Sequence, residues 1–309
     1  MLSFLPSFLL APLTVGLFII NTLFWCVPLY VVIAAKILVP SKAWRRGCTR
    51  VLSRIAEWWS ACNTWGIRLT QPIRLDTEGV DGLARNNSYL VTCNHQSWVD
   101  IVILQMVLNL RVPFPRFFLK RQLIWVPVLG SAWWALDYPF MKRRSKGYLE
   151  KHPERRGEDL EATRRSLEKH GDRPITIMNF LEGTRFRPEK HRDQGSPYRH
   201  LLKPKAGGVA FALQTMGARL REILDVTIVY PAGRAKFRHL FTGRIHEVVV
   251  RVRKLAIPDE LRMGGYLEDS VMRERFQAWI RRLWEEKDAL IESILEEYRS
   301  GLKNPRTAS

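Results

Sequence analysis

The stretch YLVTCNHQSWVD, residues 89–100, joins a short apolar run to a group of polar side chains. Its first five residues are rich in β-forming types and predict a buried strand. His95 then stands at the carboxyl end of that strand, which is where α/β sheets bind their ligands. Asp100 follows five residues later, so a helix opening between them could return its carboxylate to the imidazole. The spacing fits either an oriented general base or an aspartate that merely caps or charges a helix start.

Beyond residue 70 the chain alternates between strand-like and helix-like segments. Short runs rich in Val, Ile and Thr predict strands at 89–93, 174–180, 225–230 and 246–252. Helical patterns cover 98–110, 158–170, 205–220 and 270–299. We therefore expect an α/β domain with a largely buried mixed sheet flanked by helices.

Two polar segments, 142–157 and 185–199, are expected to be loops. The last helix carries an apolar stripe and has Gly301 as its stop. The stripe consists of Phe276, Ile280, Leu283, Leu290, Ile294 and Tyr298.

The first 35 residues carry no charged side chain. Their apolar run exceeds the roughly 20 residues that a membrane-spanning helix needs. Pro6, Pro12 and Pro28 interrupt it, so one long tilted helix and a kinked, re-entrant pair of half-helices both fit. A cleaved signal peptide is disfavoured because no basic segment precedes the run and the run is too long. We predict a retained membrane helix or helical hairpin.

Basic residues follow this run and predict its orientation. Between residues 36 and 56 there are six lysines and arginines and no acidic residue. By the positive-inside rule, this flank and the bulk of the chain face the cytoplasm.

Residues 51–69 show an amphipathic helical pattern, with Leu52, Ile55, Trp59 and Cys62 forming its apolar stripe. The surrounding tryptophans could lie at the lipid headgroup level or pack into the core, and the sequence leaves both open. They are Trp44, Trp58, Trp59 and Trp65.

The formal charge of +19 predicts a polyanionic partner. Nucleic acid, an anionic membrane and a phosphorylated substrate all fit that sign. The anchor favours the membrane, and no nucleic-acid-binding motif is found, so no nucleic-acid partner is expected. The four cysteines have no metal-ligand spacing and predict free thiols in a reducing compartment.

A second motif, FLEGTR at residues 180–185, follows another strand-like run. Gly183 allows close backbone approach, Thr184 offers a hydroxyl, and Arg185 can bind phosphate through a bidentate fork. Glu182 could hold that arginine or an acceptor hydroxyl. Alone this is an ordinary polar turn, but together with His95 it supplies an anion-binding group for a general base.

Two further segments add candidates for substrate binding. Between residues 111 and 146, eight basic residues, Lys120 among them, are interleaved with apolar and aromatic residues. Such a surface suits contact with both an acyl chain and a phosphate. Later, residues 203–208 open a helix, so its free N–H groups and Lys205 could extend an anion site.

These motifs resemble those of the glycerophospholipid acyltransferases of the lysophosphatidic acid acyltransferase family, most closely its bacterial membrane-bound YihG-like branch. The resemblance covers nearly the whole chain, through the anchor, the His95-x4-Asp100 block and segments 140–143, 180–185 and 226–231. It implies that His95 is the base, that Asp100 orients it, and that the arginine-containing blocks bind glycerol phosphate. Those blocks supply Arg143, Glu182, Gly183, Thr184 and Arg185.

Two positions depart from the family pattern. Leu181 stands where proline is usual, and Asp225 stands where the last block often begins with proline. Both departures are expected to affect backbone shape more than chemistry, and both bear on acceptor specificity.

The resemblance implies transfer of a fatty acyl group from acyl-CoA or acyl carrier protein to the sn-2 hydroxyl of lysophosphatidic acid, giving phosphatidic acid. It implies no acyl-enzyme and no metal or redox cofactor. One alternative is an acyltransferase for another lysophospholipid headgroup. Another is a non-catalytic basic membrane scaffold, which leaves both motifs unexplained. A metal-dependent hydrolase lacks a third ligand at a recognisable spacing.

The expected organisation has three parts. Residues 1–70 form the anchor and an amphipathic interfacial helix, 71–301 the acyltransferase domain, and 302–309 a mobile tail. The expected location is a membrane, in particular the bacterial inner membrane, with the catalytic domain on its cytoplasmic side.

Overall fold

The computed structural model of the chain describes residues 2, 4–142, 146–152, 158, 161, 164–166, 171, 173–220, 222–258 and 269–301. Arg143, the predicted tail 302–309 and most of the helix predicted at 158–170 lie outside the described residues.

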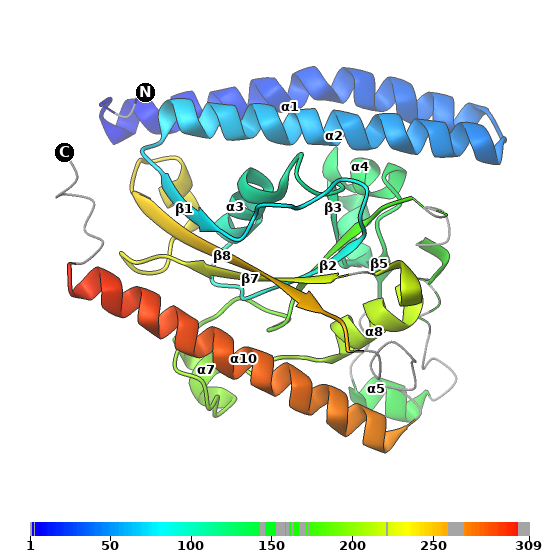
Figure 1. Ribbon diagram of the computed structural model, residues 1–309. Coiled ribbons are helices and arrows are strands. Elements are labelled where there is room, and N and C mark those ends of the chain that lie inside the picture. Colours follow the sequence, from blue (N-terminus) through cyan, green and yellow to red (C-terminus); the bar gives the residue numbers. More distant parts are fainter. Residues whose placement is uncertain are drawn as a thin grey trace.

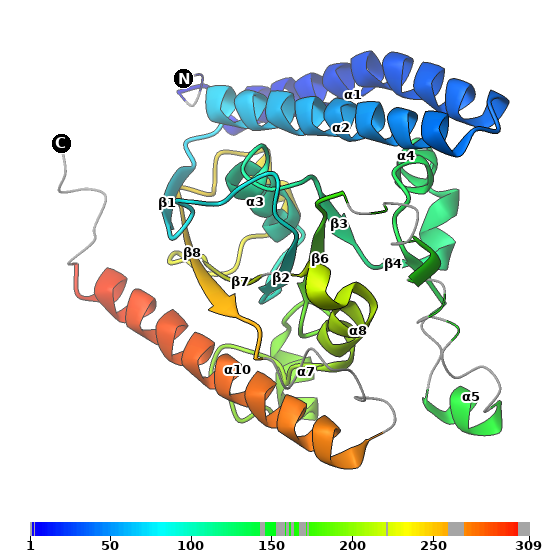
Figure 2. The ribbon, with the colours of Figure 1, turned by 45° about the vertical axis from the view of Figure 1, so that its right-hand side comes forward.

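Two long helices form an antiparallel hairpin along one side of the molecule (Figures 1 and 2). α1 (Ser7–Leu38) is one continuous helix despite Pro12 and Pro28, so the two half-helices considered from the sequence do not occur. α2 (Lys42–Thr70) lies beside it, and the Asn21 amide donates to Asn63 across the pair at 2.8 Å. Among the described residues, α1 is the one helix long and apolar enough to cross a membrane, judged by length and composition.

The amphipathic helix predicted over 51–69 is confirmed within α2, but its buried face differs from the predicted stripe. Leu52 and Ile55 are buried, whereas Cys62 is exposed. Glu57 is buried instead, because Arg54 and Arg85 pair with its carboxylate at 3.1 and 2.5 Å.

The tryptophans of this region divide between the two interpretations that the sequence leaves open. Trp44, Trp58 and Trp65 are exposed and do not pack into the core. The Trp59 indole is half-buried, and its N–H donates to Thr22 on α1 at 3.2 Å.

A six-stranded mixed sheet forms the centre of the domain, in the order β1-β8-β7-β2-β6-β3. β7 and β8 pair antiparallel, and every other neighbouring pair is parallel. The strands are β1 (Arg74–Glu78), β2 (Tyr89–Cys93), β3 (Pro115–Phe117), β6 (Thr176–Phe180), β7 (Glu222–Val229) and β8 (Glu247–Ala256). A separate two-stranded sheet joins β4 (Leu119–Lys120) to β5 (Phe140–Met141).

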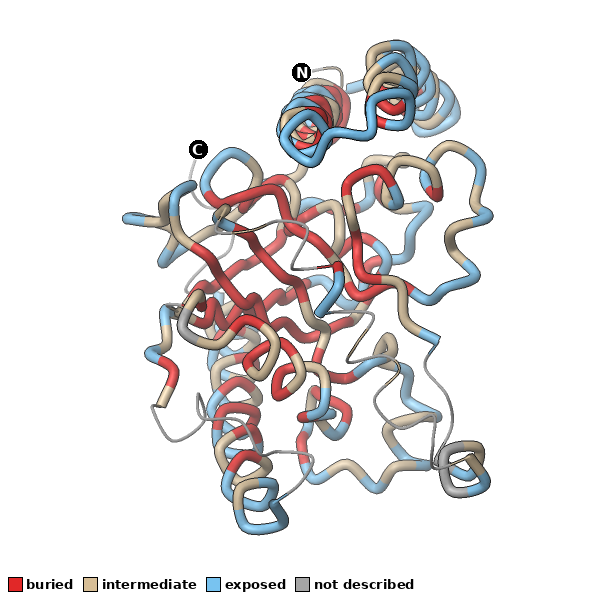
Figure 3. The backbone as a smooth tube through the Cα atoms, turned by 90° about the vertical axis from the view of Figure 1, so that its right-hand side faces the viewer, coloured by how far each residue is buried: buried red, intermediate tan, exposed pale blue. Residues whose placement is uncertain are grey.

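Helices cover both faces of the main sheet, and Figure 3 shows the buried residues concentrated between them. One face packs against α3 (Val99–Leu108), with the hairpin beyond it. The other face packs against α8 (Gly207–Met216) and α10 (Ser270–Arg299). A third apolar cluster joins the hairpin to the region of α4 (Leu129–Ala135). The predicted α/β fold with a buried mixed sheet is confirmed.

The predicted loops contain short helices. α5 (Lys146–Lys151) lies within 142–157, and α7 (Pro188–Asp193) within 185–199. Proline at the first position of α7 has the fixed φ that a helix start requires, which explains a helix in so polar a segment. Short 3₁₀ turns complete the described structure: η1 (Arg121–Trp125), η3 (Gly217–Arg219) and η4 (Phe237–Leu240).

A buried ion pair attaches α10 to the sheet. The Lys287 ammonium lies 2.9 Å from the Asp225 carboxylate on β7, and both side chains are fully buried. Arg253 on β8 binds the same carboxylate at 2.8 Å. A proline at position 225 could not make these ion pairs, so this departure affects charge as well as backbone shape. The helix ends at Arg299, and Gly301 follows with a φ of +76°, as the sequence predicts.

Candidate active site

The candidate site begins where β2 ends, and Asn94 fixes that point. Its side-chain amide accepts from the Ile228 N–H and donates to the Ile228 carbonyl, each at 2.9 Å. The side chain thereby continues the β2–β7 ladder one residue beyond the strand. Because Asn94 is held in this way, the next residue, His95, leaves the sheet at a defined position.

His95 and Asp100 meet as the motif predicts. The imidazole Nδ1 lies 2.9 Å from Asp100 Oδ2, and the ring stacks on Phe180 with centroids 3.9 Å apart. Asp100 is in the first turn of α3 and fully buried. Its side chain therefore both orients the histidine and lies at a helix start, so the two interpretations of the spacing describe one arrangement.

Asp100 is surrounded by donors. Oδ2 also accepts the backbone N–H groups of Gln96 and Ser97 at 2.7 and 2.8 Å. A carboxylate that receives this many donors fits the ionised, acceptor-only form. Nδ1 of His95 then carries its proton toward Asp100, which leaves Nε2 as the basic nitrogen of the ring.

Tyr230 completes this arrangement and is not predicted from the sequence. Its hydroxyl donates to Asp100 Oδ1 at 2.6 Å. Burial raises the pKa of the phenol well above its ordinary value, and the neighbouring Asp100 charge adds to the effect, so the hydroxyl stays a donor. The sequence feature that could have pointed to Tyr230 is its place at the end of an apolar strand, directly before Pro231.

Glu182 has a different role from the one predicted. Its carboxyl group is fully buried and accepts the His95 N–H at 2.7 Å and the Leu202 N–H at 3.2 Å. It therefore ties the β6 loop to the histidine backbone, rather than holding Arg185. Burial raises the pKa of Glu182 to about 8, although the two N–H groups act in the opposite direction.

The rest of the 180–185 motif forms a partly exposed cationic loop. Gly183 has a φ of +65°, and a Cβ there would approach the Lys205 side chain to 3.0 Å. Thr184 accepts from Lys190 at 2.5 Å. The Arg185 guanidinium lies 4.5 Å from the centroid of the exposed Trp98 ring. The structure thus brings Lys205 to this loop as predicted and adds Lys190, which was not among the predicted site residues.

Leu181 shows what its departure from the family's proline allows. The residue is fully buried, and its N–H donates to the Cys93 carbonyl at 3.2 Å. A proline has no N–H and could not make this bond between the ends of β2 and β6.

The described basic residues of the segment 111–146 lie in different environments. Arg116 is buried and donates to the Leu136 carbonyl and the Ser53 hydroxyl, which is a structural role. Lys120 is exposed at the end of β4, in the smaller sheet, whereas the cationic loop follows β6 of the main sheet. Within the described part of the chain, no group of three or more His, Cys, Asp and Glu side chains could hold a metal ion.

Comparisons with known proteins find a matching family model and several relatives. The family model described as Acyltransferase matches residues 74–231. The 1-acyl-sn-glycerol-3-phosphate acyltransferase gamma of Mus musculus is 28% identical over 185 residues, covering 56% of this chain and 44% of its own length. The delta protein of Mus musculus is 24% identical over 269 residues, covering 81% and 62%. The chain spans roughly half the length of these relatives.

A solved structure shares the fold. The 1-acyl-sn-glycerophosphate acyltransferase PlsC from Thermotoga maritima superposes with a TM-score of 0.51 at 17% identity, covering 93% of this chain and 95% of that one. The family model spans about half of the chain and contains both motifs, from β1 to the residue after Tyr230. The chain therefore belongs to the acyltransferase family, together with the enzymes named 1-acyl-sn-glycerol-3-phosphate acyltransferases.

Proposed function

We propose that the protein transfers a fatty acyl group from a thioester, acyl-CoA or acyl carrier protein, to the sn-2 hydroxyl of lysophosphatidic acid. The product is phosphatidic acid. The observation that carries this proposal is the 2.9 Å contact between His95 Nδ1 and the buried Asp100, which leaves Nε2 as a base.

In this mechanism Nε2 of His95 takes the proton of the lysophospholipid hydroxyl as its oxygen attacks the thioester carbonyl. The carbon–sulfur bond then breaks, and the imidazolium returns the proton to the departing thiolate. Asp100 stabilises the positive charge on the ring while it exists. No acyl-enzyme forms, and the reaction requires no metal or redox cofactor. General-base catalysis of this kind is typically worth about 10²–10⁴-fold.

The cationic loop supplies the acceptor's binding group. Arg185 presents a planar fork of donors that matches a phosphate, and Lys205 and Lys190 bring ammonium groups to the same loop. This favours a lysophospholipid with a free phosphate over one whose phosphate carries a further headgroup.

We infer that α1 lies along a membrane face. Gln71 donates to Thr14 at 2.8 Å near one end of the helix, and Lys36 pairs with Asp137 at 3.0 Å near the other. These points are about 33 Å apart at 1.5 Å per residue. If α1 crossed the ~30 Å hydrocarbon core, its two ends could not both contact the domain. Exposed apolar side chains along α1 and the basic flank support an interfacial position, with the domain on the cytoplasmic side.

The test is an acyl-transfer assay on detergent-solubilised protein. Labelled acyl-CoA, or acyl carrier protein in a second arm, is incubated with lysophosphatidic acid and with lysophospholipids that carry choline, ethanolamine or glycerol. We expect thioester consumption and phosphatidic acid formation, with lysophosphatidic acid preferred. Equal use of a capped headgroup would contradict the phosphate assignment. No transfer to any lysophospholipid would leave the scaffold alternative in place.

A further inference from the structure

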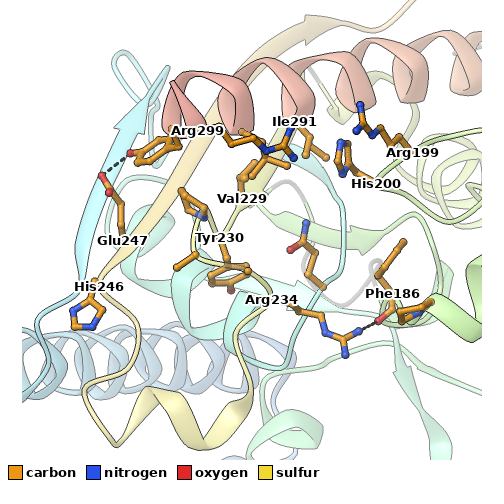
Figure 4. A pocket seen from close by; sticks show the side chains of 17 residues that line it. Phe186, Arg199, His200, Val229, Tyr230, Arg234, His246, Glu247, Ile291 and Arg299 are labelled. Carbon is orange, nitrogen blue, oxygen red and sulfur yellow. Dashed lines mark hydrogen bonds between the residues drawn. The ribbon is translucent and has the colours of Figure 1, made fainter. Parts of the chain in front are cut away.

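A cavity of about 780 Å³ opens at the carboxyl edge of the sheet, between the end of β7 and the last turns of α10 (Figure 4). Its apolar wall includes Val229, Ile291 and Leu295. The proposed mechanism assigns no substrate to this space. Its volume lies in the range that holds a drug-sized or nucleotide-sized molecule.

The cavity shares two residues with the candidate active site. Tyr230 lines it and donates its hydroxyl to Asp100. Gln96 also lines it, follows His95 in the chain, and donates its N–H to the same carboxylate. A ligand bound in the cavity would therefore reach to within one residue of the base.

The rim of the cavity is cationic. Arg199, Arg234 and Arg299 line it. Figure 4 shows Arg234 beside Phe186, whose carbonyl accepts from its guanidinium at 2.6 Å. Arg299 is the last residue of α10, and Arg199 lies in the segment between α7 and α8. Their side chains are 58% and 67% exposed. Both guanidinium groups therefore reach solvent, where a ligand could contact them in addition to their carboxylate partner.

The nearby carboxylates are already engaged. Glu292 pairs with Arg199 at 2.9 Å, with Arg299 at 3.1 Å, and with His200. Glu247 accepts from the Tyr298 hydroxyl at 2.5 Å. One glutamate therefore holds two arginines and a histidine side by side, which pre-orders them for an anion and lowers the entropy cost of binding it.

We propose that this cavity binds the phosphate-bearing nucleotide end of a coenzyme A thioester. The ligand's identity rests on the proposed function, which needs a thioester donor beside His95. The arginines match the phosphates of such a donor, and the apolar wall suits its base and its pantetheine arm. In the proposed function the acceptor's single phosphate binds the loop at 183–185, which leaves the three arginines of the rim for a ligand with several phosphates.

The test compares two donors that differ only in the nucleotide. The double variant Arg199→Ala/Arg299→Ala is assayed with acyl-CoA and with the acyl thioester of pantetheine. Arg282→Ala, an exposed arginine on α10 outside the cavity lining, is the matched control. We expect the KM for acyl-CoA to rise about 10–100-fold, as for loss of charge-assisted hydrogen bonds, with kcat within about twofold. The KM for acyl-pantetheine and both KM values of Arg282→Ala should stay unchanged.

Three results would overturn the inference. The KM for lysophosphatidic acid could change in place of that for acyl-CoA, which would assign the cavity to the acceptor. The double variant could change only the KM for acylated carrier protein, which would assign the rim to a protein partner. The KM for acyl-CoA could also stay unchanged while transfer to lysophosphatidic acid is normal, in which case the proposed function survives without this site.

Calorimetric titration with coenzyme A itself separates the two proposals. If wild-type protein binds coenzyme A more than tenfold more tightly than the double variant but acylates no lysophospholipid, the cavity assignment stands and the proposed function fails. Equal binding by both proteins, at the same melting temperature, rejects the cavity assignment without reference to turnover.

Discussion

The two sides of His95 differ in how their polar groups are satisfied. On one side, Asp100, Tyr230 and Glu182 are buried, and their polar atoms contact one another or the histidine. On the other side, Gly183 to Arg185 and Lys205 are partly or fully exposed. The buried side has its geometry before substrate arrives, as general-base chemistry requires. The exposed side keeps cationic groups available for an anion. The proposed chemistry and recognition can therefore be tested separately.

The largest effect is expected from His95→Ala on the buried side. The change removes the base, so kcat should fall by about 10²–10⁴-fold. The loss should appear at saturating concentrations of both substrates. Radiometric acyl transfer by purified protein measures it.

Membrane association should not change in this variant, because the α1–α2 hairpin does not depend on His95. His239→Ala, in η4, is the matched control and should keep normal turnover. Normal turnover by His95→Ala would contradict the proposed mechanism.

On the exposed side, Arg185→Ala should act on the acceptor. The KM for lysophosphatidic acid is expected to rise about 10–100-fold, because a charge-assisted pair with phosphate is lost. If Arg185 binds the phosphate more tightly in the transition state than in the ground state, kcat falls as well. Arg192→Ala, an exposed arginine in α7, is the control and should leave both constants unchanged. An unchanged KM for lysophosphatidic acid in Arg185→Ala would contradict the phosphate role.

The sequence predicts the centre of the fold better than its edges. β2 is predicted to the residue, because a run of apolar and β-branched residues is what a strand buried on both faces requires. β1 was missed, because RLDTE is polar and lies at the sheet edge. β3, with three residues, is too short for any pattern to emerge.

The site is predictable only as far as local spacing reaches. His95 and Asp100 are five residues apart, so one turn can join them. Tyr230 is 130 residues from Asp100, and its contact depends on the pairing of β2 with β7. Glu182 was found but given the wrong partner, because the pairing of β2 with β6 turns it toward the His95 N–H.

A smaller effect is expected from Tyr230→Phe. The change removes one donor from Asp100 but leaves the other three, so kcat should fall about tenfold with both KM values unchanged. Tyr89→Phe is the matched control, because it removes a buried hydroxyl that accepts the Ala84 N–H at 2.9 Å at the opposite end of β2. Equal loss of kcat in both variants would mean that Tyr230 acts only through stability.

The smallest effect on turnover is expected from Glu182→Gln. This variant is informative because it should change how the stability of the protein depends on pH. The pKa of Glu182 is about 8 in the folded protein, against 4.5 as its ordinary value. Between these values the folded state holds a proton that the unfolded state has lost, so stability is greatest below pH 4.5 and falls as the pH rises toward 8. From pH 6 to 8 this group should cost roughly 2–3 kcal/mol. Melting temperatures in detergent across that range measure the loss.

In Glu182→Gln that contribution disappears. The amide oxygen can still accept the His95 N–H, whereas its NH₂ faces the Leu202 N–H, which lowers stability by the same amount at every pH. The slope, rather than the melting temperature at one pH, is therefore the informative quantity. Parallel slopes for the two proteins would mean that Glu182 is ionised throughout. The buried side of His95 would then carry a second negative charge beside Asp100. The two sides of His95 would differ in the sign of their charge as well as in their exposure.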